Sequence, residues 1–203
     1  SSSAASDVYK RQQFRFTQGQ YLVMRTQLDN EEVRRSYSIC SAVQDGELRV
    51  AVKRVPGGRF SAFANEVLKE GQQLEVMPPS GSFFVPLDPA RQGNYLGVAA
   101  GSGITPILSI IATTLASEPH SRFTLLYGNR SSSGALFRDK LEDLKNRYLD
   151  RLNLIFVFSR EQQDVDLYNG RIDADKCGQL FSRWLDVAGL DAAFVCGPQA
   201  MTE

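Results

Sequence analysis

The first half of the chain carries the hydrophobic pattern of short antiparallel strands. Leu48, Val50 and Val52 recur at every second position, as expected of a strand with one buried face. Similar short runs end at Gly, Pro, Asp or Asn, which favour turns. The strands predicted in this way are residues 21–26, 35–40, 48–54 and 73–77. With one helix predicted over residues 61–69, this half is typical of a small antiparallel β-barrel.

The second half changes to apolar strands that alternate with helices. Phe137, Leu141, Leu144 and Tyr148 lie on one face of a predicted amphipathic helix. The predicted strands are residues 95–100, 123–127, 154–158 and 193–196, and the predicted helices are residues 106–116, 136–149 and 175–185. This alternation predicts a parallel sheet covered on both faces. The Pro- and Gly-containing segment 86–93 divides a first domain, residues 13–90, from a second, residues 91–203.

Composition and charge exclude several classes of function. The 23 basic and 23 acidic residues balance, so there is no electrostatic reason to expect binding to nucleic acid or to an anionic membrane. The single histidine, His120, excludes a multi-histidine metal site. The three cysteines form no CxxC pair, so we expect no metal or iron–sulfur site within the chain, reduced thiols and a cytoplasmic location. Apolar runs fall short of the about 18 residues that a membrane span needs.

The two ends of the chain carry little pattern. Residues 1–12 are small, polar and without periodicity, so we interpret them as a tag, a junction or a disordered terminus. Residues 201–203 follow a predicted strand and turn without a closing helix. We therefore expect the chain to be part of a longer protein.

A glycine-rich turn, GSGITP over residues 101–106, joins a predicted strand to a predicted helix. Gly101 and Gly103 allow a sharp turn whose amides can approach an anion, and Pro106 is expected at the first helical position. The helix N-terminus then offers free N–H groups to a diphosphate. Pro106 stands where a full GxGxxG fingerprint has its third glycine, so a plain strand-to-helix turn remains an alternative.

The loop after the next predicted strand is basic and rich in serine. It offers Arg130, three serines from Ser131 onward, and Arg138, with no carboxylate before Asp139. In a dinucleotide fold this position meets the adenosine ribose, where Arg accommodates a 2′-phosphate and an acidic residue favours a free 2′-hydroxyl. The loop favours NADPH over NADH, although a solvated loop without this role is the alternative.

Three further motifs remain ambiguous when each is taken alone. RSYS, residues 35–38, is also compatible with an ordinary strand. In VKRVPGGRFS, residues 52–61, a glycine turn with Arg59 beside it leads to Ser61, which is a candidate helix cap. This motif is either a second anion-binding turn or an ordinary capped helix. CGP, residues 196–198, ends the last predicted strand, where open α/β sheets bind ligands, but a buried cysteine is usually structural.

Taken in this order, the five motifs resemble the ferredoxin–NADP reductase superfamily. The resemblance covers about residues 14–203, and the stretches RRSYSIC, VAVKRVPGGRFSAFA, ATTLASEP and FTLLYGNR are nearest to a reductase that serves an epoxidase complex. It implies a flavin-binding β-barrel followed by an α/β domain that binds a nicotinamide nucleotide. It also implies an FAD oxidoreductase that accepts hydride from NADPH and passes electrons to an iron–sulfur domain or an oxygenase partner.

The resemblance assigns roles to named residues. Tyr37 would stack on the flavin ring, Ser38 would bond near its N5, and Cys196 would lie beside the nicotinamide C4. Flavin contacts are implied for Arg35, Tyr37, Ser38, Ile39, Val52, Lys53, Gly58, Arg59, Phe60 and Ser61. Nucleotide contacts are implied for Gly101, Ser102, Gly103, Thr105, Pro106, Asn129, Arg130, Ser131, Arg138, Cys196, Gly197 and Pro198.

Two departures from the family pattern leave other functions open. The reductase nearest in wording carries a C-terminal [2Fe–2S] domain with four cysteine ligands, and this chain ends before any such domain. The family's strand before Phe14 also has no counterpart, which would expose a sheet edge. A stand-alone flavin reductase or diaphorase, and a docking fragment without catalysis, are the alternatives.

Overall fold

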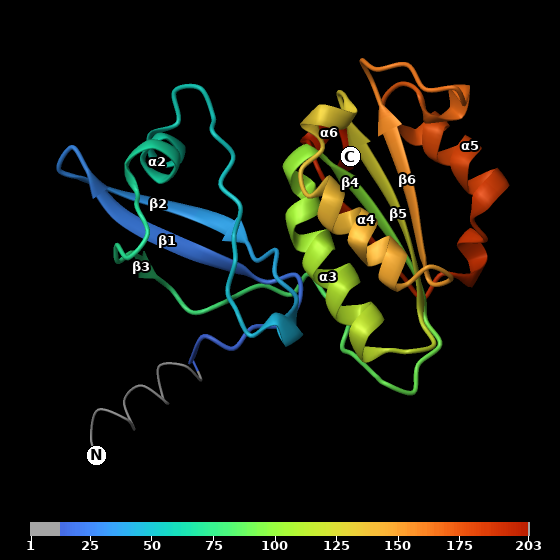
Figure 1. Cartoon of the computed structure of the whole chain (residues 1–203), viewed down its shortest axis with the longest axis horizontal. Coiled ribbons are helices and arrows are strands. Elements are labelled where there is room, and N and C mark those ends of the chain that lie inside the picture. Colours follow the sequence, from blue (N-terminus) through green and yellow to red (C-terminus); the bar gives the residue numbers. More distant parts are fainter. Residues whose placement is uncertain (1–12, 203) are drawn as a thin grey trace.

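The computed structural model describes residues 13–202, and the assigned tag or disordered segment, residues 1–12, lies outside them. An antiparallel β-domain comes first and a parallel α/β domain follows, with helix α3 (Ile104–Ser117) between the first domain and the second sheet (Figure 1). This confirms the predicted fold class. Among residues 13–202, no helix is long and apolar enough to cross a bilayer.

The first domain is built on a three-stranded antiparallel sheet of order β2-β1-β3. Its strands are β1 (Tyr21–Leu28), β2 (Glu31–Ser38) and β3 (Glu75–Val76). Asp29 and Asn30 both have positive φ, 52° and 63°, as a two-residue hairpin turn requires. Bridges Tyr21–Ser80 and Ile39–Val50 extend the pairing beyond the strands. Within the described residues, the predicted barrel is therefore a short sheet with these two added bridges.

Two local predictions in this domain are wrong. Residues 48–54 form no strand, because only Arg49 and Val50 pair with the backbone of a neighbouring segment: the Arg49 carbonyl accepts the Cys40 N–H at 2.8 Å, and Val50 bridges Ile39. The helix predicted over residues 61–69 begins earlier, as α2 (Arg59–Ala62), and continues as a π-helical turn, Phe63–Val67. It ends where Leu68 becomes extended.

The second domain has a four-stranded parallel sheet, as predicted. Its strand order is β6-β5-β4-β7. Its strands are β4 (Asn94–Ala100), β5 (Arg122–Asn129), β6 (Leu152–Phe158) and β7 (Ala192–Cys196). Helices α3 and α4 (Arg138–Arg147) cover one face, and α5 (Ala174–Trp184) covers the other (Figure 1). A short helix α6 (Gln199–Thr202) follows β7. Helix α4 begins at Arg138, two residues later than predicted, because Phe137 has a left-handed φ of 58°.

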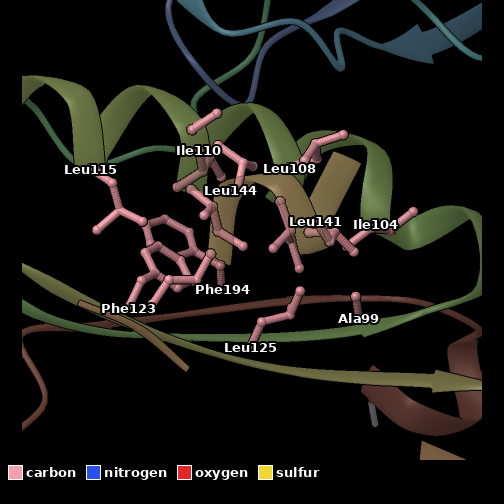
Figure 2. Packing of buried hydrophobic residues seen from close by; sticks show 14 of the residues in the cluster. Ala99, Ile104, Leu108, Ile110, Leu115, Phe123, Leu125, Leu141, Leu144 and Phe194 are labelled. Atoms are coloured by element: carbon pink, nitrogen blue, oxygen red, sulfur yellow. The ribbon is translucent and has the colours of Figure 1, made fainter. Parts of the chain in front are cut away.

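Helix α3 is the centre of the main hydrophobic core. Every residue from Ile104 to Leu115 is buried. Its apolar side chains pack with Phe123 and Leu125 of the sheet and with Leu141 of α4 (Figure 2). Helix α3 is therefore covered on all sides. The first domain covers the side that the sheet does not, where it bonds to Ser109 and Thr113.

A buried carboxylate holds the segment between the domains at the far end of α3. Glu118 is 1% exposed and accepts hydrogen bonds from the Tyr95 hydroxyl at 2.9 Å, the Ser121 hydroxyl at 2.7 Å and the Asp88 N–H at 3.0 Å. Arg91 forms an ion pair with it at 3.5 Å. Each carboxylate oxygen is therefore satisfied, which offsets the cost of burying the charge.

Candidate functional site

Three of the predicted motifs meet at one edge of the parallel sheet. Ala99 of β4 pairs with Cys196 of β7, and Ala100 pairs with Gly128 of β5. The turn after β4, the loop after β5 and the loop after β7 therefore leave the sheet side by side. Carboxyl ends of parallel strands are where open α/β sheets bind ligands.

The glycine turn at this edge is tightly packed on one side and open on the other. Gly101 has a φ of 54°, and no atom lies within 4 Å of where its Cβ would stand. A Cβ on Gly103 would instead be 2.0 Å from the Cys196 carbonyl oxygen, so only glycine allows this close approach. The Tyr127 hydroxyl donates to the Gly101 carbonyl at 3.0 Å, and the Thr105 hydroxyl donates to the Ser102 carbonyl at 3.0 Å.

The start of α3 differs from the sequence prediction. Residues Gly101–Gly103 form a 3-10 turn, and α3 begins at Ile104, so Pro106 is its third residue rather than its first. This position still lies in the first turn, whose N–H groups have no partner within the helix. Proline therefore removes no helical hydrogen bond, and the N-terminus of α3 faces the edge described above.

Cys196 and the two residues after it form the other wall of the glycine turn. Cys196 is half-buried, and burial raises the pKa of its thiol, so the neutral form dominates at neutral pH. A Cβ on Gly197 would lie 2.4 Å from the Met201 methyl group and 3.2 Å from the Ala100 Cβ. The CGP turn therefore fits closely between β4 and α6.

In the loop after β5, some polar groups are already bonded to other residues, and others have no bonding partner among the described residues. The Arg130 side chain is exposed and has no ion pair among residues 13–202, whereas Arg138 pairs with Glu142 at 2.8 Å. The hydroxyls of Ser131 and Ser133 are 3.1 Å apart. The amide nitrogen of Asn129 is buried, and no hydrogen bond of good geometry satisfies it among the described residues. These groups leave donors available at the predicted ribose position.

Sequence reasoning missed one residue of this loop region. The Glu161 carboxylate accepts the Ser132 N–H at 2.7 Å and the Ser132 hydroxyl at 2.9 Å. The backbone N–H, then the hydroxyl and the charge of Arg138, hold the pKa of Glu161 below its usual range. Glu161 lies 29 residues from Ser132 in the chain, and only the alignment of β5 with β6 brings the two together.

The predicted flavin residues lie at the end of β2. The Tyr37 ring packs against Phe60 with ring centroids 5.5 Å apart and an interplanar angle of 33°. Partial burial raises the pKa of Tyr37, and the charge of Arg35 partly offsets that rise. Arg35 itself is exposed, and its guanidinium donates to the Arg34 carbonyl at 2.7 Å. Ser38, the last residue of β2, is half-buried.

The turn over residues 52–61 is closed by its own side chains. The Ser61 hydroxyl accepts the Val55 N–H at 3.1 Å and donates to the Gly58 carbonyl at 3.0 Å. Ser61 is the third residue of α2 and closes the turn, and Gly58 is the N-cap of the helix. This corrects the prediction that Ser61 is the cap. Arg59 bonds to the β1–β2 turn, through Glu31 and the Leu28 carbonyl at 2.5 Å each.

Direct contacts connect the two predicted sites across the domain boundary. The Ser109 hydroxyl of α3 donates to the Ser41 carbonyl at 2.7 Å, and the Thr113 hydroxyl accepts the Val43 N–H at 3.1 Å. Ser41 follows Ser38 by three residues, and Ser109 lies five residues after the start of α3. The end of β2 is thus positioned relative to the helix that carries the glycine turn.

Comparison with known proteins gives two domain matches in the expected order. Residues 7–85 match the oxidoreductase FAD-binding domain, and residues 98–203 match the oxidoreductase NAD-binding domain. The chain is 50% identical over 190 residues to one component of the 1,2-phenylacetyl-CoA epoxidase of Escherichia coli, covering 94% of this chain and 53% of that protein. It is 35% identical over 186 residues to the ferredoxin reductase component of 3-ketosteroid-9-alpha-monooxygenase of Mycobacterium tuberculosis, covering 91% and 48%. The chain therefore spans about half the length of these curated relatives.

Solved structures show the same fold. A ferredoxin–NADP+ reductase variant of Plasmodium falciparum in complex with 2′P-AMP has a TM-score of 0.77 at 22% identity, covering 93% of this chain and 78% of that chain. The cytochrome b5 reductase domain of Ulva prolifera nitrate reductase has a TM-score of 0.70 at 25% identity, covering 91% and 76%.

The residues present fit the two cofactors that these domains bind. Open space over Gly101 and the exposed guanidinium of Arg130 share one edge, as a nucleotide site requires. The half-exposed ring of Tyr37, backed by Phe60, offers an aromatic surface beside the exposed Arg35. The chain belongs to the family of oxidoreductase NAD-binding domains and, with the FAD-binding domain ahead of it, is a ferredoxin–NADP reductase-like oxidoreductase.

Proposed function

We propose that this chain takes reducing equivalents from NADPH onto FAD and delivers them to an iron–sulfur or oxygenase partner. The observation that carries the proposal is the glycine turn, which is open above Gly101 and held against the Cys196 carbonyl at Gly103. This packing leaves open space at the N-terminus of α3, where a diphosphate would lie beside the CGP turn. When bound, the nicotinamide and flavin rings supply the hydride chemistry.

The protein residues position the two rings and need no acid–base chemistry of their own. Residues 101–105 would hold the nucleotide diphosphate, and the neutral Cys196 thiol would fill the space beside the nicotinamide without adding charge. Tyr37 would cover one face of the flavin while Phe60 holds its ring in place. Ser38 would donate a hydrogen bond at the reacting edge of the flavin. Alignment of this kind accounts for much of the rate of a bound reaction.

On the flavin side, the phosphate-binding role falls first to Arg35. Its guanidinium is exposed and makes only a backbone hydrogen bond among the described residues. Val52 and Lys53 would contact the ribityl and pyrimidine side, and the turn from Gly58 to Ser61 would contribute backbone groups. Arg59 would join these contacts only by leaving Glu31, because its guanidinium is bonded to that carboxylate.

We propose NADPH as the preferred donor because Arg130 and the serines after it meet the adenosine end of the nucleotide. The Arg130 guanidinium is free of carboxylate partners within residues 13–202, so it can pair with a 2′-phosphate. Arg138 would add positive charge near the 2′-phosphate while it remains paired with Glu142.

The partner is proposed from the relatives. One relative is a component of phenylacetyl-CoA epoxidase and another is the ferredoxin reductase component of a monooxygenase. We propose that the chain serves an oxygenase of this kind, in phenylacetyl-CoA epoxidation, through an iron–sulfur centre outside residues 13–202. The three free cysteines are consistent with a reducing compartment, which supports a cytoplasmic location.

A purified chain reconstituted with FAD tests this function. We expect a yellow protein whose flavin absorption is bleached without oxygen by NADPH faster than by NADH at equal concentration. A colourless protein that gains no thermal stability from added FAD would contradict the proposal and favour a docking fragment. Fast reduction of ferricyanide without reduction of a plant-type ferredoxin would instead favour a stand-alone diaphorase.

A further inference from the structure

Glu161, an acidic residue, is bonded to the loop for which we propose contacts to the 2′-phosphate. Its carboxylate oxygen Oε2 accepts both the backbone N–H and the hydroxyl of Ser132, at 2.7 Å and 2.9 Å. Ser132 follows Ser131 and Arg130 in the loop that carries the proposed phosphate contacts. Two donors that could bind an incoming phosphate are therefore occupied by a negative charge of the protein itself.

The position of Glu161 is determined by the backbone. Past the ends of β5 and β6, the Ser159 N–H donates to the Asn129 carbonyl at 2.9 Å, and the Arg160 N–H donates to the Arg130 carbonyl at 2.8 Å. These bonds continue the ladder between the two strands and deliver residue 161 beside Ser132. Only the Glu161 side chain is then free to rotate away.

We infer that Glu161 is an internal anion that competes with the 2′-phosphate and so sets the preference between phosphorylated and unphosphorylated nucleotides. The inference rests on the proposed function of this edge of the sheet. A carboxylate and a phosphate cannot share the same two donors, and two negative charges in contact repel each other. A nucleotide with a 2′-phosphate must displace Glu161, whereas one with a 2′-hydroxyl can bind while Glu161 stays on Ser132.

The charges around Ser132 make this competition reversible. The charge of Arg138 acts favourably on Glu161, and Arg130 is exposed beside the same loop. When a phosphate arrives, these cations can compensate it, and the displaced carboxylate can enter water because Glu161 lies at the surface. Glu161 therefore moderates the NADPH preference that Arg130 and Arg138 create.

The experiment measures binding of two small nucleotides to the full chain by calorimetry, without turnover. The probes are adenosine 2′,5′-bisphosphate, which carries the 2′-phosphate, and 5′-AMP, which does not. The variant is Glu161→Gln, which keeps an acceptor for Ser132 but removes the charge. Asp164→Asn is the matched control, because Asp164 is exposed on the same segment and its side chain has no partner among the described residues.

For Glu161→Gln we expect the bisphosphate to bind about tenfold more tightly and 5′-AMP to bind as before, with both unchanged in Asp164→Asn. If Glu161 has only a structural role, Glu161→Gln would weaken the binding of both nucleotides, and this result would overturn the inference. An unchanged ratio of the two affinities would also overturn it. If the parent chain binds 5′-AMP and the bisphosphate equally and Glu161→Gln changes neither, the inference fails while the nucleotide site stands. If the parent chain binds neither probe, the proposed function itself fails.

Discussion

Single side chains at the nucleotide edge differ in how far they are already committed. Arg130 is exposed and unpaired within residues 13–202, Arg138 is paired with Glu142, and Glu161 is bonded to Ser132. A free guanidinium can meet a phosphate without first losing another partner, whereas a paired one gains less. We therefore expect Arg130 to bind the phosphate directly, and Arg138 and Glu161 to modify how tightly it binds.

Arg130→Ala is expected to weaken NADPH binding by roughly 10- to 150-fold, the range of one charge-assisted hydrogen bond, and to leave NADH nearly unchanged. Dissociation constants of both nucleotides measure this. Arg147→Ala, which removes an exposed arginine from the other end of α4, is the control and is expected to alter neither constant. Equal losses for NADPH and NADH would contradict the assignment.

Ser38→Ala is expected to slow reduction of bound FAD several-fold without releasing it, because one hydrogen bond near the reacting edge is lost. Stopped-flow measurement gives the rate of flavin reduction, and a separate titration gives the affinity for FAD. An unchanged reduction rate would remove Ser38 from the site.

Gly103→Ala is expected to disrupt the glycine turn, because the new Cβ would stand 2.0 Å from the Cys196 carbonyl oxygen. We expect a loss of about 1–3 kcal/mol in unfolding free energy and weaker nucleotide binding. Gly178→Ala in α5 is the control: no atom lies within 4 Å of its Cβ, so about 0.5–1 kcal/mol of stabilisation is expected. Urea titrations of both variants measure the unfolding free energy. The same change in both variants would contradict the close contact of Gly103 with Cys196.

At the scale of elements, α3 depends on what surrounds each of its two ends. Its N-terminus follows the 3-10 turn Gly101–Gly103 and stays open, whereas its C-terminus is closed by polar groups. The Arg151 guanidinium donates to the carbonyls of Leu115 and Glu118 at 2.9 Å each. The Glu118 carboxylate then binds the segment that joins the domains. We therefore expect the N-terminus of α3 to bind the ligand and its C-terminus to contribute to stability.

Glu118→Ala is expected to lower the unfolding free energy by about 3–5 kcal/mol, because it leaves the Tyr95, Ser121 and Asp88 donors without their shared acceptor. Glu118→Gln keeps one acceptor oxygen and is expected to lose less. Thermal and urea unfolding of the two variants test this. Equal and small losses of unfolding free energy in Glu118→Ala and Glu118→Gln would show that water replaces the carboxylate.

At the scale of the whole molecule, the domain boundary determines whether the two sites can work together. Ala42 lies in the same buried cluster as α3, and Ser41 and Val43 on either side of it bond to that helix. Gln44 adds a bond to the Ala112 carbonyl at 3.1 Å. The segment that follows β2 therefore holds the flavin side against the nucleotide side.

The double variant Ser109→Ala and Thr113→Val is expected to loosen this boundary. FAD and nucleotide affinities should stay within about twofold, because neither residue lies at the carboxyl edge, while the rate of flavin reduction should fall several-fold. Stopped-flow spectroscopy measures the rate, and calorimetry should show a broadened or divided unfolding transition. Ser182→Ala, on the exposed side of α5, is the control. A reduced affinity with an unchanged rate would contradict a coupling role.

The sequence alone determined the features that depend on neighbouring residues. Alternating and continuous apolar runs predicted the antiparallel and parallel domains, and glycine, serine and arginine patterns located the motifs at strand ends. The apolar run over residues 106–116 predicted a helix, and the structure shows that this helix is buried. These inferences needed only local chemistry. The antiparallel and parallel pairings confirmed the two kinds of domain, and the three predicted helices of the second domain begin and end within two residues of their predicted bounds.

Tertiary structure decided everything that depends on distant partners. Residues 48–54 alternate like a strand, yet their backbone pairs only with Ile39 and Cys40, and they therefore form just a bridge. Glu161 joins the nucleotide edge because the β5–β6 ladder extends past the strand ends. Side chains far apart in the chain meet only when the sheet is assembled, so no local pattern can indicate them.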